Sequence, residues 1–271
     1  NPPYVGYTRK NKETKVAVCE IYQLCDYYTL PTSNLYAFTI ERTYYITHKK
    51  SYNGMIIPIS AFANDSMKEL QKFIRDKYGN IHISTFHQRP AQLFNGVLQR
   101  LCIFVMTKSD EKLKVFTSPI YRWYSEHRDT LFQLVSYVES FQDDQNHILK
   151  IGSSIENSIY HKYRENTIIG KFVAQSYNAN NRIYYRTAGG GYWVTFLNDE
   201  FDCVAVSNKS TGIVSDVNAK ILTAALNSNL FWWYYAINFD LFNFKDYMIF
   251  GFQCDADKMT REIKKGMIKV S

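Results

Sequence analysis

The strongest constraint on the fold is an alternation of amphipathic helical patterns with short, fully apolar runs in the N-terminal part of the chain. Asn34 is a candidate N-cap for a helix over 35–50, whose apolar residues recur at helical spacing. The continuous apolar run 54–59 predicts a buried strand, and 66–78 predicts a second amphipathic helix. Two further strands are predicted at 81–86 and 101–106. This order is typical of the second half of an open α/β sheet.

A different pattern begins after residue 118, so we predict two domains, 1–118 and 119–271. Segment 121–147 has helix-like apolar spacing. Residues 182–187 and 192–197 are β-rich and flank the glycines at 189–191, which predicts a hairpin. A phosphate-binding loop is the alternative, but it requires a helix where a strand pattern follows. Helical patterns over 216–226 and 229–236, the latter a buried helix or an interface, make this second domain α+β.

Composition indicates a globular chain with a polyanionic partner. The 271 residues are 46% hydrophobic, carry a net charge of +7 and include 22 Tyr and 18 Phe, which suits base stacking with phosphate neutralisation. The five cysteines fit neither a zinc site nor a disulfide framework, and no metal-binding set emerges, so we expect a reduced, cytoplasmic protein. The most apolar segment, 226–244, contains too many polar residues to span a membrane. The sequence does not indicate the oligomeric state.

The chain opens with Asn1-Pro2-Pro3-Tyr4, a stiff turn whose carbonyls lack competing local donors. With the Asn1 side-chain oxygen and the Tyr4 ring, it could bind the exocyclic amine of a flat base and stack on its face. Ordinary turn chemistry is the alternative. Residues 5–18 are polar and aperiodic, which predicts a mobile loop. Because no Met precedes Asn1 and no strand with a glycine-rich turn comes first, we expect a fragment whose cofactor-binding half lies upstream.

Together with segments 84–106 and 226–250, this tetrapeptide resembles the adenine-N6 DNA methyltransferases of restriction-modification systems. The resemblance implies the C-terminal half of a Rossmann-like methyltransferase sheet followed by a target-recognition domain that binds double-stranded DNA. It implies methyl transfer from S-adenosylmethionine to N6 of a flipped adenine. The cofactor would be bound mainly by the missing N-terminal half, so we expect the isolated fragment to be inactive.

The resemblance also assigns site residues. The Asn1 side-chain oxygen and the Pro2 carbonyl would accept hydrogen bonds from the adenine amine, with Pro3 completing the catalytic motif. Tyr4 would stack on the base, and Phe94 would supply a second aromatic contact, with Phe86 as the alternative. For both phenylalanines, core packing is the competing interpretation.

Basic residues of the second domain are candidate DNA contacts, although each alone could be a solvated surface charge. They are Lys162, Arg164, Lys171, Arg182, Arg186 and Lys209.

Three other functions stay open. The same tetrapeptide occurs in methylases of RNA adenine and of protein glutamine amides, whose NH2 groups pose the same chemical problem. A glutamine methylase should end soon after its sheet closes, so the long C-terminal region favours DNA. The third possibility is a non-catalytic DNA-binding or interaction module. The sequence shows no convincing nuclease cluster of acidic residues and lysine.

Overall fold

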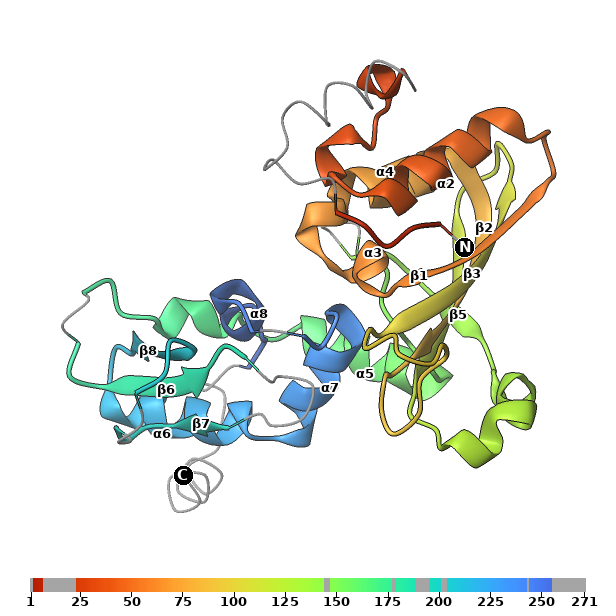
Figure 1. Ribbon diagram of the computed structural model, residues 1–271. Helices are drawn as coiled ribbons and strands as arrows, with labels where there is room; N and C mark the ends of the chain where they lie inside the picture. The colour runs from red at the N-terminus through yellow and green to blue at the C-terminus, as the bar shows by residue number, and fades with distance from the viewer. Residues whose placement is uncertain are drawn as a thin grey trace. The chain divides into compact units, whose positions relative to one another are not determined.

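The computed structural model describes residues 2–6, 23–143, 147–176, 179–188, 195–200, 204–242 and 244–254 (Figure 1). The chain divides into two compact units, which we call the N-terminal unit (Asn1–Asn157) and the C-terminal unit (Ser158–Ser271). Among the described residues, no helix combines the length and apolarity that a membrane span requires.

The N-terminal unit is built on a five-stranded mixed sheet with strand order β1-β3-β2-β4-β5. Strand β3 runs antiparallel to both β1 and β2, while β4 runs parallel to β2. The carboxyl ends of β1, β2 and β4 therefore lie at the same end of the sheet, which we call its carboxyl edge. The strands are β1 (Tyr52–Pro58), β2 (Tyr78–Phe86), β3 (Leu101–Lys108), β4 (Lys114–Tyr121) and β5 (Val138–Ser140).

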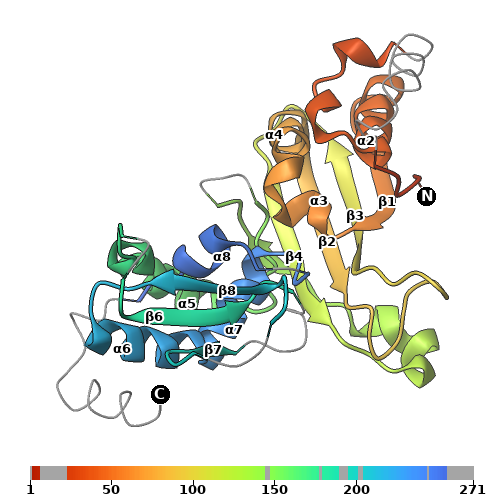
Figure 2. The same cartoon turned by 60° about the vertical axis from the view of Figure 1, so that its left-hand side comes forward.

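Three helices pack against one face of this sheet, as Figure 2 shows. They are α2 (Leu35–Ile46), α3 (Ser60–Ala63) and α4 (Lys68–Lys77). Inward-facing strand residues such as Ile81, Ile83 and Phe104 form the core with them, and the intervening His82 is exposed, as the two-residue period of a strand requires. The helices and strands predicted up to residue 106 are thus confirmed. Three short 3₁₀ helices accompany them: η1 (Leu24–Asp26), η2 (Leu30–Thr32) and η3 (Asp65–Met67).

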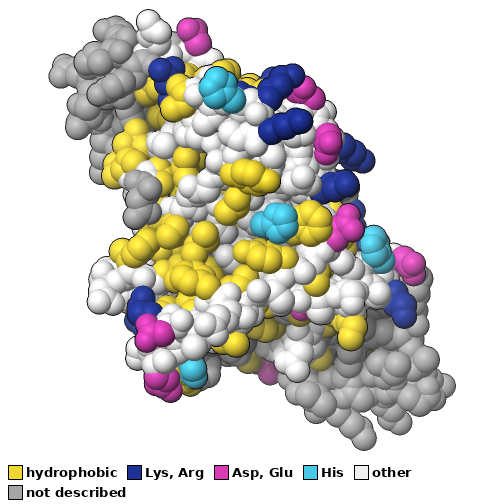
Figure 3. Space-filling model, turned by 90° about the vertical axis from the view of Figure 1, so that its right-hand side faces the viewer, with side chains coloured by type: hydrophobic (Ala, Val, Ile, Leu, Met, Phe, Trp, Pro, Cys, Tyr) yellow, Lys and Arg dark blue, Asp and Glu magenta, His cyan; other side chains and the backbone are white. Residues whose placement is uncertain are grey.

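The opposite face of the sheet carries exposed apolar side chains. Tyr52 and Val105 lie on it, together with His82, whose ring stacks on Phe116 with the centroids 4.6 Å apart. Figure 3 shows a face of the molecule on which hydrophobic side chains gather between charged ones.

The helix predicted over 121–147 is wrong. Strand β4 ends at Tyr121, a 3₁₀ helix η4 spans Ser125–Leu134, and β5 follows. The apolar residues that suggested a helix serve different neighbours, because Leu131 is buried in a small cluster whereas Leu134 is 58% exposed. A single amphipathic α-helix would bury both on one face.

The boundary expected at residue 118 falls inside β4, and the N-terminal unit continues to Asn157. Residues beyond 118 complete this unit, since β5 pairs with β4 and the Thr117 hydroxyl donates to the Ile151 carbonyl at 2.8 Å. The change of sequence pattern after residue 118 therefore does not mark the start of a new unit, because η4 and β5 still belong to the N-terminal unit.

The C-terminal unit contains a three-stranded sheet with order β7-β6-β8 and surrounding helices. The antiparallel pairing of β6 with β7 fits the predicted hairpin, while residues 189–194 lie outside the described part of the chain. The predicted helices over 216–226 and 229–236 are confirmed. The elements are α5 (Ser154–Arg164), which crosses the unit boundary, η5 (Ile169–Phe172), β6 (Arg182–Arg186), β7 (Phe196–Leu197), β8 (Asn208–Gly212), α6 (Asp216–Leu226), α7 (Asn229–Asn238) and α8 (Asp246–Phe250).

Aromatic side chains form the core of the C-terminal unit. Phe231 and Tyr235 of α7 are completely buried. The Phe231 ring lies 5.3 Å from that of Phe196, and the Tyr235 ring lies 4.4 Å from that of Phe244. Helix α7 is therefore a core helix, which decides between the two interpretations of this aromatic run.

Candidate active site

The segment Pro2–Gly6 is anchored to β1 and to the start of α2. The Tyr4 hydroxyl donates to the Ile56 carbonyl at 2.7 Å, and the Leu35 amide donates to the Val5 carbonyl at 3.1 Å. Partial burial raises the pKa of Tyr4, so its hydroxyl is a protonated donor at neutral pH. Ile56 lies two residues before the end of β1, so the Tyr4 hydroxyl contacts β1 towards its carboxyl end, and the Tyr4 side chain packs against the hydrophobic core of the unit.

The rest of the tetrapeptide is only partly described. Pro2 is buried and Pro3 is exposed, whereas Asn1 lies outside the described residues. The roles predicted for the Asn1 side chain and the Pro2 carbonyl stay predictions.

Phe94 lies in the loop 87–100, which connects β2 to β3 at the same carboxyl edge. Residues 94–97 form a turn in which the Val97 amide donates to the Phe94 carbonyl at 3.2 Å and Gly96 has φ of 81°. This is a type II turn, whose third position requires positive φ and so favours glycine. The Gln92 side chain closes the turn further by accepting from the Gly96 amide at 3.0 Å. The Phe94 side chain is half-buried, and no aromatic ring within the described ranges stacks on it.

Phe86 occupies a different environment. It is 1% exposed at the end of β2, and its ring lies 5.9 Å from that of Tyr121 and 6.2 Å from that of Phe132. A base could reach this ring only if the surrounding cluster repacked. The core interpretation therefore applies to Phe86, and Phe94 is the better stacking candidate.

A basic cluster that the sequence analysis missed surrounds His87, the first residue of this loop. Burial, and then the positive charges of Arg100 and Arg122, lower the pKa of His87 to about 4. Its Nδ1 lies 3.0 Å from the Arg89 carbonyl and 3.2 Å from the Arg89 amide, and the tautomer of the ring decides whether it donates to the first or accepts from the second. Positive charge at this edge favours an anionic ligand. In the sequence, only the run His87-Gln88-Arg89 indicates this basic cluster. Arg100 and Arg122 are distant in sequence, and the fold brings them close to His87.

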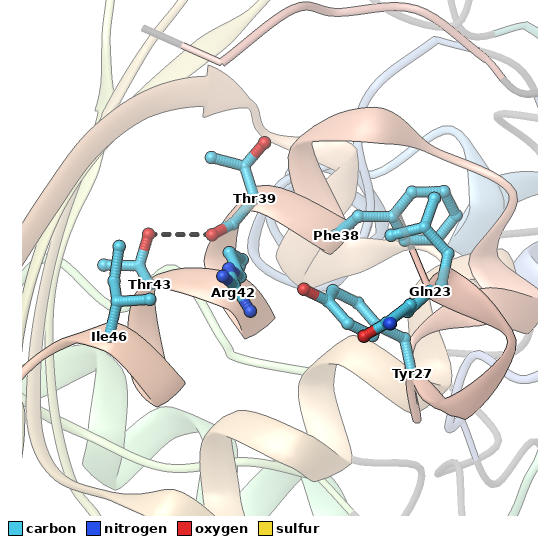
Figure 4. Close-up of a pocket in the computed structure, with 8 residues that line it drawn as sticks. Gln23, Tyr27, Phe38, Thr39, Arg42, Thr43 and Ile46 are labelled. Atoms are coloured by element: carbon cyan, nitrogen blue, oxygen red, sulfur yellow. Dashed lines mark hydrogen bonds between the residues drawn. The ribbon is translucent and has the colours of Figure 1, made fainter. Parts of the chain in front are cut away.

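A pocket of about 580 Å³ lies between η1 and α2 (Figure 4). Within its lining, Arg42 is the charged side chain, and neither an acidic residue nor a histidine or cysteine contributes. This lining therefore offers binding surface without acid, base or thiol chemistry. It is formed by Gln23, Leu24, Tyr27, Phe38, Thr39, Arg42, Thr43 and Ile46.

The structure brings two of the predicted DNA contacts together on β6. Arg182 and Arg186 alternate with Tyr184 on one face, while Ile183 and Tyr185 are buried on the other. The Arg182 Nε donates to the Ser210 hydroxyl at 3.0 Å, which orients that guanidinium along the sheet.

Lys209 belongs to the other face of this sheet. It pairs in register with the buried Tyr185, and its Nζ lies 3.3 Å from Asp246 Oδ1. Lys209 is therefore separated from the arginine face.

The remaining candidates lie outside the β6 sheet. Lys162 and Arg164 are exposed in the last turn of α5, and Lys171 of η5 is exposed with its Nζ 4.7 Å from the centre of the Phe172 ring. In the part of the chain that the structure describes, no group of three His, Cys, Asp or Glu residues is arranged to hold a metal ion.

Comparisons with known proteins identify the N-terminal part of the chain as related to methylases. The matching family is the Eco57I restriction-modification methylase, and the match covers residues 1–94. No curated protein matches the chain.

Solved structures also match. A DrdV–DNA complex has 13% identity and a TM-score of 0.43 over 54% of this chain and 17% of that one. The Type ISP enzyme LlaGI, a nuclease-deletion mutant bound to a DNA substrate mimic, has 13% identity and a TM-score of 0.46 over 69% and 17%. The DNA-bound Type ISP enzyme LlaBIII has 10% identity and a TM-score of 0.47 over 100% and 28%. The chain thus spans 17% to 28% of the length of these three structures.

Proposed function

We propose that the protein is part of an adenine-specific DNA methyltransferase of a restriction-modification system, acting on N6 of a flipped adenine in cytoplasmic DNA. The observation that carries this proposal is the anchored Tyr4 of Asn1-Pro2-Pro3-Tyr4 at the sheet edge where the Phe94 loop also lies. The family match over residues 1–94 supports it.

The residues of this edge suit the amine acceptor of the reaction. The Asn1 oxygen and the Pro2 carbonyl would accept from the two N–H bonds of the adenine amine and favour its pyramidal form as the new bond develops. Tyr4 and Phe94 would hold the base plane by stacking. S-adenosylmethionine would supply the electrophilic methyl group, and no described residue is assigned to the cofactor itself.

The C-terminal unit supports nucleic acid over a protein substrate. The arginine–tyrosine–arginine face of β6 presents two guanidinium groups and an aromatic side chain on one surface. Guanidinium groups bind phosphates and guanine edges with two parallel hydrogen bonds. We therefore assign target recognition to the C-terminal unit, with double-stranded DNA as the partner.

Methylation by the full-length protein tests the proposal. The protein is incubated with unmodified duplex DNA and labelled S-adenosylmethionine, and the digested nucleosides are separated by mass spectrometry. We expect N6-methyladenine from the wild type and none above background from Asn1→Ala. Tyr4→Ala should slow transfer about 10- to 100-fold, because a base–aromatic stack contributes roughly 1–3 kcal/mol.

Tyr4→Phe is the matched control. It keeps the ring and removes only the hydrogen bond to Ile56, a net contribution of about 1 kcal/mol to stability. Its methylation rate should stay near that of the wild type. Label on cytosine, on RNA alone or on protein would contradict the proposal, as would full activity of Asn1→Ala.

A further inference from the structure

We propose that Arg128 of η4 is a positioning residue, which holds the loop 87–100 so that Phe94 is presented to the flipped base. This inference rests on the proposed function and assigns a role to η4, a segment outside the predicted motif.

Arg128 binds the two peptide carbonyls that immediately precede Phe94. Its Nη1 donates to the Leu93 carbonyl at 3.1 Å, and its Nη2 donates to the Gln92 carbonyl at 2.6 Å. Two consecutive carbonyls held by one planar guanidinium fix the direction of the backbone as it enters residue 94. Lysine, a single ammonium point charge, cannot reproduce this two-pronged contact.

The exposed Arg128 side chain also contacts a buried ring. The guanidinium carbon lies 4.9 Å from the centre of the Trp123 ring, within the range of a cation–π contact. Trp123 is 4% exposed in the small cluster that includes Leu131, and its carbonyl accepts from the Ala91 amide at 3.0 Å. The loop backbone at Ala91 and the Arg128 side chain thus both contact the buried Trp123.

The backbone is also fixed on the other side of Phe94 by the type II turn through Gly96 and Val97. Arg128 holds the backbone before Phe94, and the turn holds the backbone after it. A stacking side chain with an immobilised backbone loses less conformational entropy when a base arrives, which lowers the free energy cost of binding the flipped state.

The test compares Arg128→Lys and Arg128→Ala with the wild type in the full-length protein. Arg75→Ala is the matched control, because Arg75 is an exposed arginine on α4 whose Nε bonds to the adjacent Asp76. Hydrogen exchange in the absence of DNA reports the loop directly. We expect the Gly96 and Val97 amides, both donors in the turn, to exchange about tenfold faster in the two Arg128 variants only.

The second measurement uses two duplexes of the same sequence: one with 2-aminopurine in place of the target adenine, for fluorescence, and one with the adenine itself, for single-turnover methylation. In both Arg128 variants, the fluorescence of the bound 2-aminopurine duplex should differ from that of the wild-type complex. The rate of methyl transfer should be about tenfold lower, with little change in the KM for DNA. The rate should be unchanged in Arg75→Ala. A merely structural role would instead lower the unfolding midpoint and leave the transfer rate of the folded enzyme unchanged.

The outcomes separate the two proposals. Wild-type exchange at Gly96 and Val97 in Arg128→Lys, or a wild-type transfer rate despite faster exchange, overturns the positioning role alone. If the wild-type protein neither methylates the DNA nor unstacks the 2-aminopurine, the proposed function fails and the role of Arg128 in it fails too.

Discussion

The buried His87 should make the stability of the N-terminal unit fall in mild acid. Burial and the neighbouring guanidinium groups lower its folded pKa to about 4, against about 6.5 in an unfolded chain. The unfolded state therefore binds the proton first as the pH falls. The stabilisation is complete above about pH 6.5 and is lost progressively between that pH and about 4.

The size of this effect follows from the shift. A difference of about 2.5 pKa units corresponds to about 3.5 kcal/mol at full titration, at roughly 1.4 kcal/mol for each unit. Between pH 7.5 and 4.5 most of the proton uptake by the unfolded chain takes place, so about 2.5 kcal/mol should be lost.

Urea unfolding at a series of pH values measures the effect. In His87→Asn, the side-chain amide can still form a hydrogen bond with the Arg89 backbone, as the His87 ring does, but the group no longer titrates. Between pH 7.5 and 4.5, we expect the free energy of unfolding of this variant to decrease by about 2.5 kcal/mol less than that of the wild type. His48→Asn, at an exposed position after α2, should keep the wild-type profile. Parallel profiles for the wild type and His87→Asn would refute the reasoning.

Two further predictions concern the C-terminal unit. Charge reversal at Arg182 and Arg186 should weaken DNA binding and make the affinity less dependent on salt, both measured by fluorescence anisotropy. Lys209→Glu, on the opposite face of the sheet, should change the affinity and its salt dependence less. Equal effects of the two changes would remove the β6 face from the interface. Phe231→Ala should cost about 3–5 kcal/mol in urea unfolding because the ring is completely buried, against less than about 0.5 kcal/mol for the 43% exposed Leu230→Ala. Similar losses would contradict the core assignment of α7.

Local patterns predicted part of the regular elements, whereas β4, α5, β8 and α8 were not predicted. The apolar run at 54–59 and the alternation around His82 specify strands because one face of each must be buried. Ser215 caps α6 through the Asn218 amide, a contact that the chain makes within one helical turn. Such signals depend on residues close in sequence.

The features that the sequence did not predict depend on distant partners. The 3₁₀ helix η4 owes its structure to the buried ring of Trp123 and to the loop carbonyls that Arg128 binds, and neither contact has a periodic signature. Phe86 is buried in a cluster with Trp123 and Leu131, which lie far along the chain. Of the candidate site, the tetrapeptide was visible as a motif. Its attachment through Tyr4 to the Ile56 carbonyl joins residues 52 positions apart, which no local pattern encodes.

The pairing of Phe86 with Leu101 has a consequence for how this protein can diversify. These residues face each other across the β2–β3 ladder, so the chain leaves and re-enters the sheet at one point. The loop 87–100 can therefore vary in length without altering the register of β2 and β3, the two strands that it connects. Its exposed residues, such as Leu98, can be exchanged for others while the buried His87 and Ala91 keep their places in the fold. The exposed surface of this loop can therefore change while the pairing of the strands behind it is kept.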